Sequence, residues 1–131
     1  NMSPRRLARL SLEAGEALAQ ALSAFGVETR VKPPNDILAR PITSLSRKRE
    51  RECGRGEGRD RPWKKLAGIL IEARSGGRRV DWLVVGVGIN VNNRLPGGLD
   101  ATSLKRLTGT TIPLTKALHT AVSAVLSLPV A

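Results

Sequence analysis

Lys-Lys-Leu-Ala-Gly-Ile-Leu-Ile-Glu, residues 64–72, is the most informative stretch of this sequence. Its central run, Leu66–Ile71, has the length of a strand and is apolar on both faces, which predicts a place in the middle of a packed sheet. Gly68 interrupts the run, and a glycine inside a strand often marks the close approach of a ligand or of another backbone. The stretch therefore predicts a buried strand that offers a floor to a ligand.

A second apolar run, Trp82–Asn90, has the same character. Gly86 and Gly88 are two residues apart in it, so both lie on one face of a strand. The short turn around Gly76-Gly77 predicts that the two runs form an antiparallel hairpin. We therefore expect a glycine-floored hairpin with a lysine at one end and an asparagine at the other.

Composition limits the class of protein. A chain of 131 residues with 40% apolar content is sufficient for one domain with a core. The net charge of +11, from 22 Lys and Arg against 11 Asp and Glu, favours anionic partners. The single cysteine, Cys53, cannot form an intramolecular disulfide, and we expect a cytoplasmic protein. No apolar stretch is long enough for a membrane span, so we expect no membrane association.

Periodicity of the apolar residues predicts the remaining elements, which are helices over 4–25, 101–107 and 113–126 and strands over 27–32 and 37–39. Pro33-Pro34-Asn35-Asp36 separates the two strands as a turn. Residues 44–62 are rich in Arg and Glu and almost free of apolar side chains, which predicts a basic, flexible insertion. The expected fold is of the α/β type, more narrowly α+β, with a mixed, mostly antiparallel sheet and helices packed on one face.

Four motifs carry a resemblance to a known family. They are Pro34-Asn-Asp-Ile-Leu38, Lys65–Glu72, Gly86-Val-Gly-Ile-Asn-Val-Asn92 and Ala101-Thr-Ser-Leu104. In this order they resemble consecutive signatures of the catalytic domain of biotin–protein ligases. The resemblance implies a biotin/lipoate ligase-like fold in which residues 1–131 form a partial, C-terminal part of that domain. It also implies that the family's N-terminal Gly-Arg loop region and its C-terminal SH3-like domain are absent from these residues.

The resemblance implies an enzyme that activates biotin with ATP and Mg²⁺ and passes the biotinyl group to a lysine of a biotin carboxyl carrier protein. Adenylation brings a carboxylate to a phosphate, so cations must neutralise the charge that develops. Lys65 matches the family's catalytic lysine, and Asp36 matches the position that holds Mg²⁺. Contacts to nucleotide or biotin are implied for Lys32, Asn35, Gly68, Gly86, Gly88 and Asn90.

Two other functions remain open. The missing N-terminal half is consistent with an inactive or split half-domain that binds nucleotide or biotin, or that needs a second chain or a homodimer through an exposed sheet edge. The positive charge is consistent with a nucleic-acid-binding protein. Against that function, the basic segment 44–62 also contains acids, and Trp63 is the single aromatic residue beside it. Pro33 stands where the ligase family usually has Trp.

Overall fold

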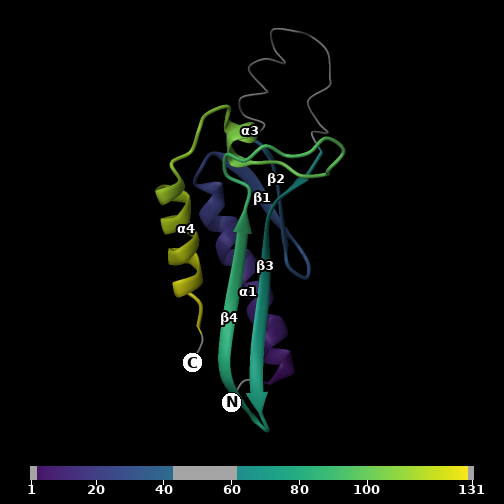
Figure 1. Cartoon of the computed structure of the whole chain (residues 1–131), viewed down its shortest axis with the longest axis vertical. Coiled ribbons are helices and arrows are strands. Elements are labelled where there is room, and N and C mark those ends of the chain that lie inside the picture. The colour runs from purple at the N-terminus through teal and green to yellow at the C-terminus, as the bar shows by residue number, and fades with distance from the viewer. Residues whose placement is uncertain (1–2, 43–61, 130–131) are drawn as a thin grey trace.

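The computed structural model describes residues 3–42 and 62–129. Its elements, shown in Figure 1, are α1 (Pro4–Ser23), β1 (Val27–Lys32), β2 (Asp36–Pro41), β3 (Lys64–Gly76), β4 (Arg79–Ile89), α3 (Leu104–Thr108) and α4 (Leu114–Leu126). The helices and strands expected from the sequence are found, with some different bounds. β2 is longer than the predicted strand 37–39, β3 and β4 extend further toward their turn, and the helix predicted from residue 101 begins at Leu104. The expected insertion at 44–62 lies, apart from Pro62, outside the described residues.

The strands form a four-stranded sheet in the order β1-β2-β3-β4, and every neighbouring pair is antiparallel. One isolated parallel bridge joins Lys65 to Ala101. The predicted α+β fold class is confirmed. The order of the strands in the sheet is therefore their order along the chain.

Helix α1 is defined by signals at both of its ends. The Ser3 hydroxyl accepts a hydrogen bond from the backbone N–H of Arg6, and Pro4 occupies the first turn, where its missing N–H leaves no bond unmade. After the helix, Gly26 adopts a left-handed backbone with φ of 84°. The buried residues of α1 are Leu10, Ala14, Gly15, Leu18, Ala19 and Leu22.

Gly15 brings α1 close to the sheet. A Cβ atom at this position would lie 3.3 Å from Cγ1 of Val31 in β1. This contact is tighter than ordinary van der Waals packing, so a larger residue would push the helix away from the strand. A glycine in mid-helix costs about 1 kcal/mol relative to alanine, and the close packing explains why it is found here.

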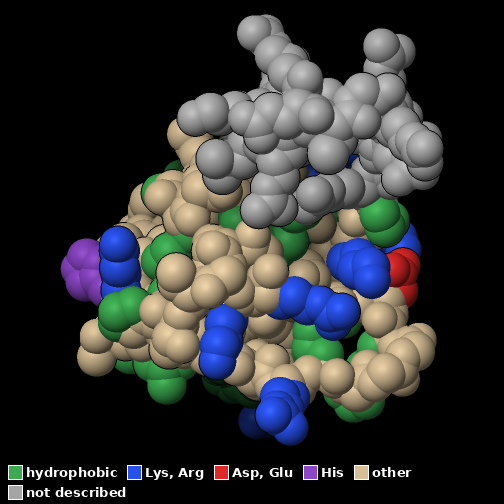
Figure 2. All heavy atoms as spheres, turned by 90° about the horizontal axis from the view of Figure 1, so that it is seen from above, with side chains coloured by type: hydrophobic (Ala, Val, Ile, Leu, Met, Phe, Trp, Pro, Cys, Tyr) green, Lys and Arg blue, Asp and Glu red, His purple; other side chains and the backbone are tan. Residues whose placement is uncertain are grey.

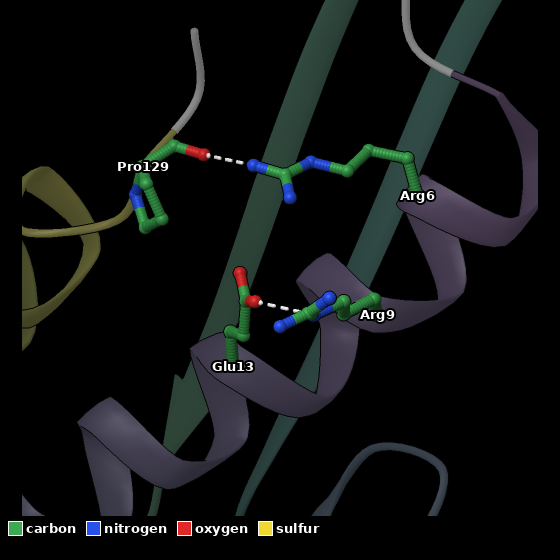
Figure 3. Close-up of polar contacts among 4 residues, drawn as sticks. All are labelled: Arg6, Arg9, Glu13 and Pro129. Atoms are coloured by element: carbon green, nitrogen blue, oxygen red, sulfur yellow. Dashed lines mark hydrogen bonds and ion pairs between the residues drawn. The ribbon is translucent and has the colours of Figure 1, made fainter.

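The core lies between one face of the sheet, α1 and α4. Figure 1 shows α1 behind the sheet and α4 beside β4. Small residues on α4 (Ala117, Ala121 and Ala124) join the same buried cluster as Leu18 and Ile69. Near the N-terminus of α1, an Arg6 guanidinium N–H donates to the carbonyl of Pro129, which follows α4, at 3.0 Å (Figure 3). Within α1, Arg9 forms an ion pair with Glu13 at 3.0 Å.

The other face of the sheet is open. Leu66, Ala67 and Ile69 are buried as predicted, but Leu70 is 59% exposed, and Trp82 and Val84 of β4 are 47% and 52% exposed. The prediction of a hairpin buried on both faces is therefore wrong for the face that carries Leu70, Trp82 and Val84. The described helices pack on one side, so the alternate residues of β3 and β4 face away from them. No helix among the described residues has the length and apolarity needed to cross a bilayer.

Candidate ligand site on the open face of the sheet

A β-bulge in β3 decides which way Lys65 points. Ile37 pairs with Ala67 and Leu38 with Lys65, so the pairing passes over Leu66. Paired residues in an antiparallel sheet share a face, and strict alternation would have placed Lys65 on the same face as Ala67. The extra residue instead allows Leu66 and Ala67 both to be buried, and it turns Lys65 to the open face.

Lys65 forms an ion pair with Asp36 on this face. Its Nζ atom lies 3.0 Å from Oδ1 of Asp36, and both side chains are partly exposed. The pair lies beside Gly68, where a Cβ atom would be 3.6 Å from Nζ of Lys65 and 3.8 Å from Oδ1 of Asp36. A cation and an anion are therefore held together next to bare backbone.

Four of the predicted site residues form a row across the whole sheet. Lys32 pairs with Asp36, Asp36 with Gly68, and Gly68 with Gly88. Successive pairs of this kind place all four residues on one face, one from each strand. The three antiparallel pairings thus bring Lys32 and Gly88, which are far apart in the sequence, onto one row of the sheet.

The glycines in β3 and β4 are not required by the backbone. Gly68, Gly86 and Gly88 are absent from the residues with positive φ. A Cβ atom at Gly88 would meet nothing within 4 Å, and one at Gly86 would lie 3.5 Å from the carbonyl of Leu70, an ordinary contact. Their effect is to leave the sheet surface bare beside the ion pair. A role in binding a ligand stays a prediction.

Asn90 is fixed where β4 ends. Its backbone N–H donates to the carbonyl of Leu66 at 2.9 Å, and its own carbonyl accepts from the N–H of Leu104 at 3.0 Å. Its side-chain Oδ1 accepts a hydrogen bond from Nδ2 of Asn93 at 3.2 Å. Asn90 is therefore tied to β3 and to α3, beside the row of site residues.

Asn35 is held by the turn that precedes β2. Its carbonyl accepts a hydrogen bond from the N–H of Ile69 at 2.9 Å, which links the turn to β3. The Pro33-Pro34 peptide bond in the same turn is cis. Asn35 is half-buried, so the backbone bond to β3 fixes the position of the residue beside Asp36.

The Ala101–Leu104 motif supports Lys65 through its backbone. The backbone N–H of Lys65 donates to the backbone carbonyl of Asp100 at 3.1 Å, and the N–H of Thr102 donates to the carbonyl of Lys65 at 2.8 Å. Ser103 caps α3 by accepting from the N–H of Arg106 at 3.1 Å. The sequence alone identifies this motif only as a family signature. The serine ahead of a short helix was the local signal for its capping role.

The residues around Asp36 fit the predicted magnesium ion only if the ion also takes ligands from a substrate and from water. Within residues 3–42 and 62–129, no three His, Cys, Asp or Glu side chains gather into a metal site. Mg²⁺ is commonly bound by one or two carboxylates together with substrate phosphates and water. Asp36 supplies one such carboxylate on the open face.

Trp63 is the centre of a contact cluster that the sequence does not predict. The guanidinium carbons of Arg30 and Arg40 each lie 4.4 Å from the centre of its ring. Arg40 also donates two hydrogen bonds to Glu28, at 2.9 and 3.1 Å. These bonds hold the pKa of Glu28 below its usual value. The cluster fixes the chain just before β3 begins.

The fold of this chain is similar to that of solved biotin protein ligase structures. No protein-family model matches this chain. The apo structure of biotin protein ligase from Aquifex aeolicus superimposes with a TM-score of 0.66 at 25% identity, over 94% of this chain and 46% of that one. The same ligase in complex with biotin and ATP gives a TM-score of 0.61 at 26% identity, over 92% and 42%.

This chain therefore spans less than half the length of the ligases that it matches. The likeness covers nearly all of this chain, and it agrees with the four sequence motifs and with the sheet that they build. It is consistent with a partial C-terminal catalytic domain. The resemblance to biotin protein ligases is confirmed, and this chain has the fold of part of a biotin protein ligase.

Proposed function

We propose that this chain carries the adenylation face of a biotin protein ligase. Such an enzyme joins biotin to ATP and then transfers the biotinyl group to a lysine of a carboxylase carrier protein. The observation that carries the proposal is the row from Lys32 through Asp36 and Gly68 to Gly88, with Nζ of Lys65 held 3.0 Å from Asp36. The likeness to a ligase in complex with biotin and ATP supports the choice of substrates.

The reaction has two steps. A carboxylate oxygen of biotin bonds to the α-phosphorus of ATP, and pyrophosphate leaves with the electron pair of the broken P–O bond. The neutral amine of the carrier lysine then bonds to the acyl carbon, AMP leaves, and the amine nitrogen releases a proton. Negative charge concentrates around the α-phosphate in the first step, so cations placed there stabilise the transition state.

Lys65 is the catalytic residue of the proposal. Its ammonium would bind the reacting phosphate, while Asp36 would hold the Mg²⁺ that accompanies ATP. That ion supplies charge neutralisation on the phosphates when it is bound. The two side chains now neutralise each other at 3.0 Å, and the proposal is that each exchanges this partner for the opposite charge of the ligand. Lys32, exposed on the same face, would provide a second cation.

The remaining predicted contacts orient the substrates. Gly68, Gly86 and Gly88 would let biotin and the adenylate lie directly on the sheet, because no side chain rises from these positions. Asn35 would support the turn that carries Asp36, and Asn90 would hydrogen-bond the adenine side. Orientation of this kind contributes strongly to catalysis, because the reacting atoms are held close together.

Calorimetric titration with biotin and ATP·Mg²⁺ tests the proposal. Lys65→Ala and Asp36→Ala should each weaken binding. Lys64→Ala removes the same charge at the adjacent residue, which takes no part in the ion pair, and should leave binding unchanged. Saturable binding that is equally sensitive to all three substitutions would contradict the proposed site.

A half-domain that needs a second polypeptide is the alternative function. Within the described residues β4 is an edge strand, and Leu83–Ile89 contains no charge or proline that would protect it. The other edge, β1, is short and carries Glu28, Arg30 and Lys32. A second chain or a homodimer would therefore add to β4. Absence of ligand heat from a folded chain, together with a dimer in light scattering, would favour this function.

We also propose a cytoplasmic location, because the single cysteine of the chain fits a reducing compartment. Nucleic-acid binding is the third candidate, and a steep salt dependence of binding to RNA or DNA would support it.

A further inference from the structure

A cationic cavity lies at the end of the molecule that carries α3. Arg94, Lys105 and Arg106 line it, together with Asn93, and its volume is about 540 Å³. No Asp or Glu is among its lining residues. Figure 2 shows that Lys and Arg side chains gather on this end of the molecule, with few acidic side chains in view.

The three cations have no carboxylate partner among the described residues. The ion pairs found there involve Arg9, Arg40 and Lys65. Arg94, Lys105 and Arg106 are exposed, so solvent and partners can reach them. Three unpaired cations around one hollow are suited to a multivalent anion.

The cavity adjoins the proposed adenylation face. Asn93, in its lining, donates a hydrogen bond to Asn90 at 3.2 Å. The N–H of Lys105 donates to the carbonyl of Val91 at 2.9 Å, which fixes the start of α3 against the residue that follows Asn90. A ligand in this cavity would therefore lie next to Asn90, at the adenine side of the proposed adenylation face.

We propose that the cavity binds carboxylates of the carrier protein that flank its acceptor lysine. This inference rests on the proposed function. The acceptor lysine must approach Lys32 and Lys65 on a chain of net charge +11, so its own positive charge is repelled unless neighbouring acids offset it. Carboxylates seated on Arg94, Lys105 and Arg106 offset that repulsion and bring the amine to the open face. The cavity lining contains no aromatic residue, which disfavours single-stranded nucleic acid as the occupant.

Titration of the whole chain with an unbiotinylated carboxylase carrier domain, at physiological salt, tests the inference. The variant is Lys105→Glu with Arg106→Glu. Its control, Arg78→Glu with Arg79→Glu, makes the same charge change at the far tip of the β3–β4 hairpin (Figure 1). The cavity variant should lose carrier affinity about tenfold or more, while the control stays within about twofold because distant charges are screened. Lys105→Gln with Arg106→Gln serves if the Glu pair fails to fold, since the backbone bonds at these positions remain possible.

The outcomes separate this inference from the proposed function. Adenylate formation without carrier reports on the function alone. Loss of carrier binding in the cavity variant supports the inference even if the chain forms no adenylate. A carrier domain with its flanking acids changed to amides should bind the original chain as weakly as the cavity variant binds the unchanged carrier. Equal losses in the cavity and hairpin-tip variants, or no carrier binding by the original chain, would overturn the inference.

Discussion

Substitution of Gly88 by alanine separates ligand binding from folding. A Cβ atom at this position would meet nothing within 4 Å, so the fold accepts it without a clash. Alanine restricts the unfolded chain more than glycine does, and the free energy of unfolding should stay unchanged or rise by about 0.5–1 kcal/mol. If biotin or its adenylate lies on this glycine, the added methyl occupies space that the ligand needs. Overpacking of this kind costs about 1–3 kcal/mol, which lowers affinity about 5- to 150-fold.

The assay pairs urea unfolding with calorimetric titration of biotin and ATP·Mg²⁺. Gly97→Ala is the control, because it also adds a methyl in open space and its φ is not positive, but it lies in a loop and not in the sheet. Gly68→Ala provides a second comparison, since its Cβ would lie 3.5 Å from Cε of Lys65 and directly beside the ion pair. Unchanged affinity in a stable Gly88→Ala protein would refute the prediction that biotin or its adenylate lies directly on Gly88.

Three further changes test the packing. Leu18→Ala removes a fully buried side chain and should lower the free energy of unfolding by about 2–5 kcal/mol in urea titration. A loss no larger than that caused by the same substitution of an exposed leucine would contradict the core assignment. Trp63→Ala removes two guanidinium contacts and should cost about 1–2 kcal/mol by the same measurement. The pKa of Glu28 is lowered by Arg40, so this pair stabilises the fold above pH 4.5, and the stabilisation is lost as the pH falls through the lower, folded value. Glu28→Gln should flatten the fall in stability below pH 4.5; an unchanged acid slope would refute the contribution.

Much of the fold could be predicted because local patterns and turns agree. The alternation in Val27–Lys32 and the helical spacing that ends at Gly26 matched the observed elements. The hairpin between the two apolar runs was predictable from the Gly76-Gly77 turn. Pairing across that turn also fixes that Gly86 and Gly88 share a face, since the side-chain period of a strand is two residues.

The orientation of Lys65 could not be predicted from β3 alone. Alternation along the strand places it with Ala67, on the covered face, and only the pairing with β2 introduces the bulge at Leu66. The exposure of Leu70 was missed for a related reason, because an apolar run does not reveal whether a helix covers both of its faces. The cationic cavity was missed because Arg94, Lys105 and Arg106 match no local motif and come together only when the chain folds.

The bulge also explains how the site residues are kept in place on a sheet that is partly uncovered. Leu66 and Ala67 are anchored in the core, so the backbone on the C-terminal side of Lys65 cannot shift without opening the core. The bonds to Asp100 and Thr102 hold the backbone of Lys65 itself. The far end of the hairpin lacks such anchors and is largely exposed. Local opening should therefore begin at that end, and hydrogen exchange should be slowest around Leu66, where the core and the candidate site meet.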